Sequence, residues 1–215
     1  KRTRRGKKSK LEGVTFFFAN ITSLSQKATV YLADCKEDVI LLAETHVVSA
    51  DERREFKEIS NAGWRQRKNF TNPAIFSPDS PSGTHGGTAV LPRGNLHTSP
   101  ISSVIPKESG GGKDGGDDLA ACVIHARGRT ITIISGYARG GRFRDLLSRV
   151  AFITRNGRLP FILAADFNAE PQDIKGSSEL EILRASVILP RNGTITCHAG
   201  RTGRTIDYII ASNTI

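Results

Sequence analysis

The stretch FILAADFNAEP, residues 161–171, decides how this chain folds. Five apolar residues are followed at once by Asp166, Asn168 and Pro171. A short, continuous apolar run that ends in turn-forming residues is typical of a strand buried on both faces of a sheet. Polar side chains that follow such a strand lie at the rim of the sheet, where folds gather polar groups into a cleft.

The same pattern recurs along the rest of the chain. We predict strands at residues 14–19, 39–43, 87–91, 119–125, 130–135, 161–165 and 206–211. We expect helices between them, at 23–34, 50–62 and 145–154. Linkers rich in turn-forming residues are predicted at 72–85 and 106–118. This mixture, with a hairpin at 119–135, predicts an α/β sandwich in which two sheets pack face to face with helices outside.

Length and composition indicate a folded chain with one large domain. The chain has 215 residues, of which 38% are hydrophobic and 24% charged, close to globular averages. We expect residues 11–215 to form that domain, after a basic tail at residues 1–10. The first residue is not Met and the last ones follow a strand-like run, so we expect a fragment of a longer protein.

The positive charge is concentrated in the first ten residues, KRTRRGKKSK. They hold seven of the 31 basic side chains, and the other 24 nearly balance the 21 acidic ones, although the whole chain is +10. Such a run binds polyanions by neutralising phosphates. A solvated linker and a nuclear-import signal are the alternatives.

The remaining composition points to an intracellular protein. Three cysteines, Cys35, Cys122 and Cys197, are too few and too scattered for a disulfide framework or a zinc site. We therefore expect free thiols. No apolar stretch is long enough to span a bilayer, and the N-terminus lacks the apolar part of a secretory signal. We expect no membrane partner and an intracellular, nuclear location.

Polar side chains cluster at the ends of the predicted strands. They are Asn20, Glu44, His46, Tyr137, Asp166 and Asn168, with Asp207 at the start of the last strand. A carboxylate in such a place is commonly a turn former, but the repetition favours a shared cleft. Carboxylate and amide oxygens suit Mg²⁺ or Mn²⁺. A carboxylate can also orient and deprotonate a water, which suits phosphoester hydrolysis.

Five blocks carry a resemblance to a known family. LLAETH and AADFNAEP are similar to the two strongest motifs of the endonuclease/exonuclease/phosphatase superfamily, which has a DNase I-like fold, although Ala165 stands where glycine is usual. GGTAVL, SGYARGG and RTIDYIIAS match three more blocks in the same order. The chain most resembles the apurinic-type endonuclease domain of non-LTR (LINE-like) retrotransposons. The resemblance implies a four-layer α/β sandwich with two mixed β-sheets flanked by helices.

The resemblance also implies roles for these residues. Asn20 and Glu44 would hold the catalytic metal, and Asp166 would activate the attacking water. Asn168 would contact the scissile phosphate and Tyr137 would stabilise developing charge. Asp207 would orient a histidine that the family places further along, beyond Ile215, so a C-terminal truncation is expected. Thr22 stands where the family often has an acidic residue.

Four further residues are weaker candidates. His46 completes the ETH motif and is a candidate catalytic residue, with a packed strand-end histidine as the alternative. We expect Thr196, Arg201 and Arg204 to lie on a loop that faces DNA and to contact it.

The function expected is metal-dependent nicking of DNA by the target-site endonuclease of a retrotransposon, a monomer followed by a reverse transcriptase. Two alternatives stay open. One is an inactive remnant that only binds nucleic acid. The other is a phosphatase or phosphodiesterase of the same fold that acts on another phosphoester; the basic tail disfavours it.

Overall fold

The computed structural model describes residues 13–67, 70–76, 83–101, 118–126, 128–191, 195–197 and 203–215. The predicted basic tail, most of the linker expected at 106–118, and Arg201 lie outside these ranges.

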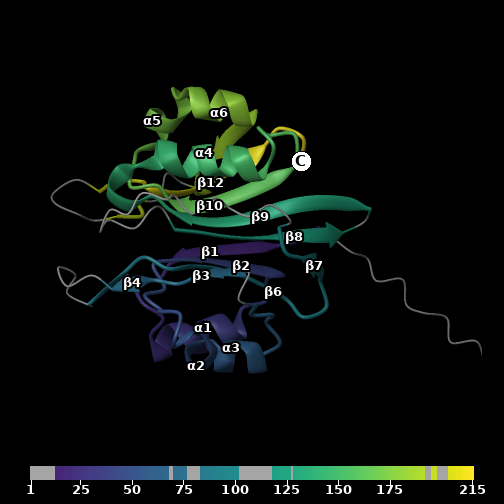
Figure 1. Ribbon diagram of the computed structural model, residues 1–215, viewed down its shortest axis with the longest axis vertical. Coiled ribbons are helices and arrows are strands. Elements are labelled where there is room, and N and C mark those ends of the chain that lie inside the picture. Colours follow the sequence, from purple (N-terminus) through teal and green to yellow (C-terminus); the bar gives the residue numbers. More distant parts are fainter. Residues whose placement is uncertain are drawn as a thin grey trace, which may run out of the picture.

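Two sheets pack face to face at the centre of the molecule (Figure 1). The first has the order β1-β2-β6-β3 and the second the order β11-β12-β10-β9-β8-β7. The strands of the first sheet are β1 Phe16–Asn20, β2 Val39–Ala43, β3 Thr71–Asn72 and β6 Thr88–Pro92. Those of the second are β7 His97–Ser99, β8 Asp118–Ala126, β9 Arg129–Tyr137, β10 Phe161–Asp166, β11 Ala185–Ile188 and β12 Asp207–Ser212. A separate two-stranded hairpin is formed by β4 Ile75–Phe76 and β5 Thr84–His85.

Helices cover the outer face of each sheet, which completes the four layers visible in Figure 1. On the first sheet lie α1 Gln26–Asp34, α2 Glu52–Glu55 and α3 Lys57–Asn61. On the second lie α4 Phe143–Ile153, α5 Pro171–Lys175 and α6 Ser178–Leu183. In the described part of the chain no helix is long and apolar enough to cross a membrane.

Three apolar clusters hold the layers together. One joins α4 and α6 to the six-stranded sheet, and another joins α1 and α3 to the four-stranded sheet. The third lies between the two sheets and includes Leu41, Val90, Cys122 and Ile133, all fully buried. The hydroxyl of Ser135 donates to the Leu42 carbonyl at 2.7 Å, which links β9 to β2 inside this layer.

The predicted architecture and all seven predicted strands are confirmed. The strand β1 is only half-buried, because it lies at the edge of its sheet and not in the middle. The helix expected at 50–62 is two short helices that break at Phe56. The linker expected at 72–85 contains part of β3 and the β4–β5 hairpin, which are too short to show a period in the sequence.

Candidate active site

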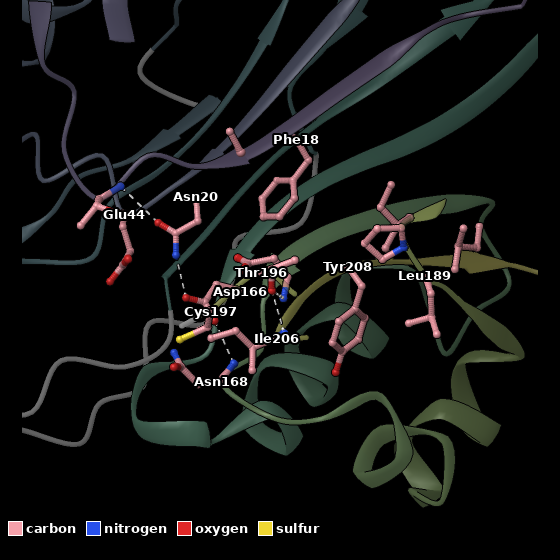
Figure 2. A pocket seen from close by; sticks show the side chains of 16 residues that line it. Phe18, Asn20, Glu44, Asp166, Asn168, Leu189, Thr196, Cys197, Ile206 and Tyr208 are labelled. Atoms are coloured by element: carbon pink, nitrogen blue, oxygen red, sulfur yellow. Dashed lines mark hydrogen bonds between the residues drawn. The ribbon is translucent and has the colours of Figure 1, made fainter. Parts of the chain in front are cut away.

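A cleft of about 730 Å³ opens at one rim of the sandwich, where strand ends from both sheets meet (Figure 2). Its polar lining consists of Asn20, Thr22, Glu44, Asp166, Asn168, Thr196, Cys197 and Asp207. Apolar side chains from β1, β12 and the end of β11 complete one wall. Six of the predicted site residues therefore lie in one cleft: the strand-end residues Asn20, Glu44, Asp166, Asn168 and Asp207, and the weaker candidate Thr196.

Strand register places three of the predicted residues in a row. Asp166 at the end of β10 is paired with Asp207 of antiparallel β12 and with Tyr137 of parallel β9. Paired residues of neighbouring strands have side chains on the same face of a sheet. The row therefore presents two carboxyl groups and a phenol toward the same side.

The side chain of Asn20 joins the two sheets at the cleft. Asn20 lies at the end of β1, and its Nδ2 donates to Asp166 Oδ2 at 2.8 Å. Its Oδ1 accepts from the backbone N–H of Thr22 at 3.2 Å, which fixes the orientation of the amide. Figure 2 shows the Asn20 amide between Glu44 and Asp166.

A tight turn after β10 holds Asn168. The backbone N–H of Asn168 donates to Asp166 Oδ1 at 2.9 Å, and its Nδ2 donates to the Ala138 carbonyl at 3.2 Å. Asn168 has φ 48°, a left-handed conformation that asparagine tolerates better than most residues. Both oxygens of Asp166 thus accept hydrogen bonds, so this carboxylate has a fixed position.

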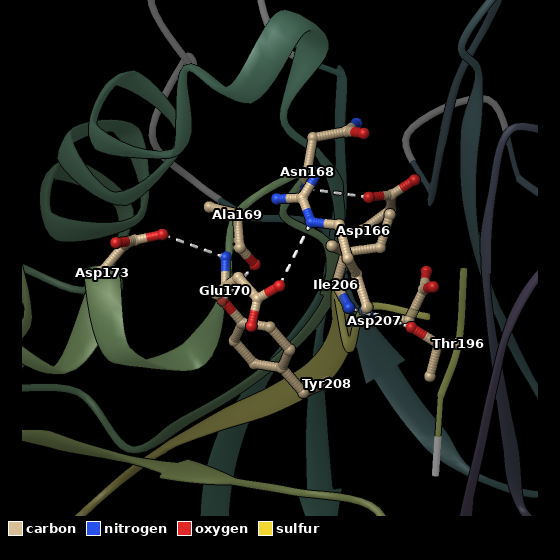
Figure 3. A network of polar contacts seen from close by, with 10 residues as sticks. Asp166, Asn168, Ala169, Glu170, Asp173, Thr196, Ile206, Asp207 and Tyr208 are labelled. Atoms are coloured by element: carbon tan, nitrogen blue, oxygen red, sulfur yellow. Dashed lines mark hydrogen bonds and ion pairs between the residues drawn. The ribbon is translucent and has the colours of Figure 1, made fainter. Parts of the chain in front are cut away.

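Thr196 positions the start of β12 (Figure 3). Its Oγ1 accepts from the backbone N–H groups of Ile206 and Asp207 at 2.9 and 3.0 Å. Tyr208 stacks on Phe167 with ring centroids 4.4 Å apart, and its hydroxyl donates to the Ala169 carbonyl. These contacts tie the Asp207 strand to the turn that carries Asn168.

Glu44 and His46 lie on the segment that follows β2. Both have positive φ, 54° and 56°. The N–H of Thr45 donates to the Gly87 carbonyl at 3.0 Å. A Cβ at Gly87 would lie 2.4 Å from the Thr45 hydroxyl oxygen, so this close approach requires glycine. Glu44 lines the cleft, whereas His46 does not, and its Nδ1 contacts Thr84 Oγ1 at 3.1 Å.

Burial, with neighbouring carboxylates, raises the pKa of Asp166, Asp207 and Tyr137. Burial, followed by the charge of Asp207, raises the pKa of Asp166 to about 7. Burial also raises the pKa of Asp207, with Glu44 adding to the effect and the Thr196 hydroxyl opposing it. Burial and the nearby carboxylates Glu44 and Asp166 raise the pKa of Tyr137, so its hydroxyl stays protonated. Burial lowers the pKa of His46.

These residues fit a divalent metal ion in their donor chemistry. Three carboxylates gather around one amide, and Asp207 Oδ1 is buried without a hydrogen-bond partner among the described residues. A hard cation would neutralise this cluster, and Mg²⁺ commonly takes only one or two protein carboxylates and keeps several waters. The described residues contain no group of three or more His, Cys, Asp or Glu side chains that could by themselves hold a metal ion. Asn20 and Glu44 both line the cleft, and their role as metal ligands stays a prediction.

The three residues predicted to contact DNA, Thr196, Arg201 and Arg204, have different surroundings. Thr196 lines the cleft, but its hydroxyl oxygen accepts from backbone. Arg204 forms an ion pair with Glu170, with Nε and Oε1 3.2 Å apart. Arg201 lies outside the described residues. Their contact with DNA stays a prediction.

Two further residues of this region, Arg139 and Cys197, were not predicted from the sequence. Arg139, two residues after Tyr137, is close enough for its charge to lower the pKa of the phenol. Cys197 lines the cleft and is partly exposed. The SGYARGG block contained the signal for Arg139, whereas nothing local distinguishes Cys197 from the two buried cysteines.

The sequence profile of the endonuclease/exonuclease/phosphatase family matches residues 22–215. The chain therefore belongs to this family. No curated protein matches the chain in sequence.

Solved structures show the same fold at low sequence identity. The endonuclease domain of TRAS1, a telomere-specific non-LTR retrotransposon, is 17% identical with a TM-score of 0.59, over 94% of this chain and 86% of that one. The human Nocturnin catalytic domain with bound sulfate anion is 20% identical with a TM-score of 0.58, over 93% and 83%. The AP endonuclease LMAP from Leishmania major is 12% identical with a TM-score of 0.60, over 93% and 79%. At these identities the likeness shows the fold alone.

Proposed function

We propose that this chain is a divalent-metal-dependent endonuclease that nicks DNA. The observation that carries the proposal is the fixed Asp166 carboxylate, held by Asn20 and Asn168 beside Glu44 and Asp207 in one open cleft. A positioned carboxylate next to oxygen ligands for a hard cation suits hydrolysis of a phosphodiester. The net charge of +10 favours a polyanionic substrate such as DNA.

Residues of the cleft divide the reaction with Tyr137, which is buried behind the cleft and does not line it. Asp166 orients a water and accepts its proton as the water oxygen bonds to phosphorus and the bond to the leaving oxygen breaks. Asn168 and the protonated Tyr137 are the hydrogen-bond donors for charge that develops on the phosphate. A metal ion held by Asn20 and Glu44 would polarise a phosphoryl oxygen and stabilise the leaving oxyanion.

We further propose that the natural role is target-site cleavage for a non-LTR retrotransposon. The five sequence blocks support this role, and the TRAS1 endonuclease domain has the same fold. The role implies action in the nucleus and a reverse transcriptase elsewhere in the same polyprotein.

The test is a nicking assay on supercoiled plasmid. We expect relaxed circles with Mg²⁺ or Mn²⁺ and none with EDTA. Binding of a duplex without nicking under all metal conditions would favour the inactive remnant. Hydrolysis of p-nitrophenyl phosphate or inositol phosphates with no action on plasmid would favour the non-DNA phosphoesterase.

A further inference from the structure

The β4–β5 hairpin is attached directly to the segment that carries Glu44. The N–H of His46 donates to the Gly86 carbonyl at 2.9 Å, and the N–H of Ala74 donates to the Val47 carbonyl at 2.8 Å. The Thr84 hydroxyl contacts His46 Nδ1 at 3.1 Å. The hairpin therefore has a defined position relative to the cleft. In Figure 1 both β4 and α5 lie on the left of the molecule, and α5 follows the turn that carries Asn168.

Phe76 on this hairpin is the most exposed of the large hydrophobic side chains in the described ranges, at 78%. Hydrophobic stabilisation is proportional to the apolar area that is buried, so folding gains little from this side chain. Phe76 is paired with Thr84 across the hairpin, and cross-strand partners lie on the same face. The register therefore places Phe76 beside Thr84, whose hydroxyl contacts His46, two residues from Glu44.

We propose that Phe76 packs against the sugar and base surface of the DNA strand beside the cleavage site. This inference rests on the proposed endonuclease function. DNA held with a phosphate in the cleft has to extend past its rim, and the hairpin borders the Glu44 side of that rim. An exposed aromatic ring there offers a flat apolar surface, which stacks on bases or wedges into a groove without reading a particular sequence.

A matched control is available at the opposite end of the molecule. Phe152 of α4 is 52% exposed. It borders a small cavity with Thr132, which is paired with Phe161 at the start of β10, whereas Asp166 is at the end of that strand. Phe152 is therefore an exposed phenylalanine remote from the cleft.

The experiment places a tryptophan at each position in turn. The chain has one tryptophan, Trp64, which is 2% exposed and supplies a constant background. Phe76→Trp and Phe152→Trp are titrated in EDTA with a 20-base-pair duplex, so that binding is followed without cleavage. We expect the duplex to quench the fluorescence of Phe76→Trp. It should change the fluorescence of Phe152→Trp no more than that of the unaltered chain, which has Trp64 alone.

Phe76→Ala supplies the second measurement. Stacking on a base is worth about 1–3 kcal/mol, so its affinity for the duplex should fall about 5- to 160-fold. Its thermal midpoint should match that of the unaltered chain because the ring is exposed, and Phe152→Ala should bind normally.

Two results would overturn the inference. If the unaltered chain binds and nicks DNA while Phe76→Trp is not quenched and Phe76→Ala binds normally, only the role of Phe76 falls. If the unaltered chain binds no duplex, the proposed endonuclease function falls with it.

Discussion

Four residues of the cleft region have a backbone conformation that side chains rarely adopt. Thr22, Glu44, His46 and Asn168 have φ between 48° and 56°. A left-handed residue other than glycine costs roughly 1 kcal/mol, and such strain is concentrated at functional sites. In this protein these left-handed residues turn the chain sharply after β1, β2 and β10. Thr22, Glu44 and Asn168 line the cleft as a result, and His46 lies next to it.

Removing either central carboxylate tests the assigned roles. We expect Glu44→Gln and Asp166→Asn to lower the nicking rate at least about 10²-fold, because one loses a metal ligand and the other the base. Both variants should still fold, since each amide keeps the side-chain shape and removes one charge from a repulsive cluster. In Asp166→Asn the new NH2 group cannot accept one of the two hydrogen bonds that Asp166 accepts, which offsets part of this gain. Glu58→Gln on the exposed face of α3 is the control. Near-normal nicking by a folded variant would refute the mechanism.

The cysteines provide a second test at this scale. Burial raises the pKa of Cys122 to about 12, so almost no thiolate exists at pH 8, whereas Cys197 is partly exposed at the cleft. We expect iodoacetamide at pH 8 to modify Cys197 and to spare Cys122 in the folded chain. Peptide mass spectrometry measures both, and unfolding in urea should make them equally reactive. Equal labelling without urea would contradict the burial of Cys122.

At the scale of elements, one arginine joins the helical layer to the four-stranded sheet. Arg93 follows β6, and its guanidinium donates to the carbonyls of Cys35, Glu37 and Ala62. It also lies over the Trp64 ring, with Cζ 3.7 Å from the centroid. Cys35 and Ala62 are the C-caps of α1 and α3, where carbonyls lack helical partners and favour a cation.

Replacing Arg93 should therefore loosen this layer. We expect Arg93→Ala to cost about 2–4 kcal/mol, from the lost hydrogen bonds and the cation–π contact. Urea unfolding followed by Trp64 fluorescence measures the loss. Arg93→Lys keeps the charge but lacks the planar guanidinium with its several N–H donors. Its stability should therefore lie between those of Arg93→Ala and the unaltered chain. A cost under about 0.5 kcal/mol would show that water replaces these contacts.

At the scale of the whole molecule, the two sheets contribute different parts of one site. The four-stranded sheet supplies Asn20 and Glu44, and the six-stranded sheet supplies Asp166, Asn168 and Asp207. The intersheet cluster and the Asn20–Asp166 bond set their relative position. The net charge, by contrast, is concentrated at the N-terminal end of the sequence, away from these motifs along the chain.

This separation predicts that the basic segment affects binding and not folding. Deleting residues 1–10 removes seven positive charges and no apolar residue. If all seven meet phosphates, the slope of log affinity against log salt should change by up to about 6. The thermal midpoint should stay the same. Fluorescence anisotropy with a labelled duplex at several salt concentrations measures the slope, and an unchanged slope would exclude contact between this segment and DNA.

The sequence by itself determined the family, the seven main strands and the identity of the cleft carboxylates. These features are legible because a buried strand is a continuous apolar run, and Glu44 and Asp166 directly follow such runs. The tertiary structure alone decided which groups touch. Asn20 and Asp166 are 146 residues apart, and the engagement of Arg204 by Glu170 and the exposure of Phe76 have no local pattern. Such contacts depend on strand register and sheet packing, whereas sequence periodicity reports only on neighbours along the chain.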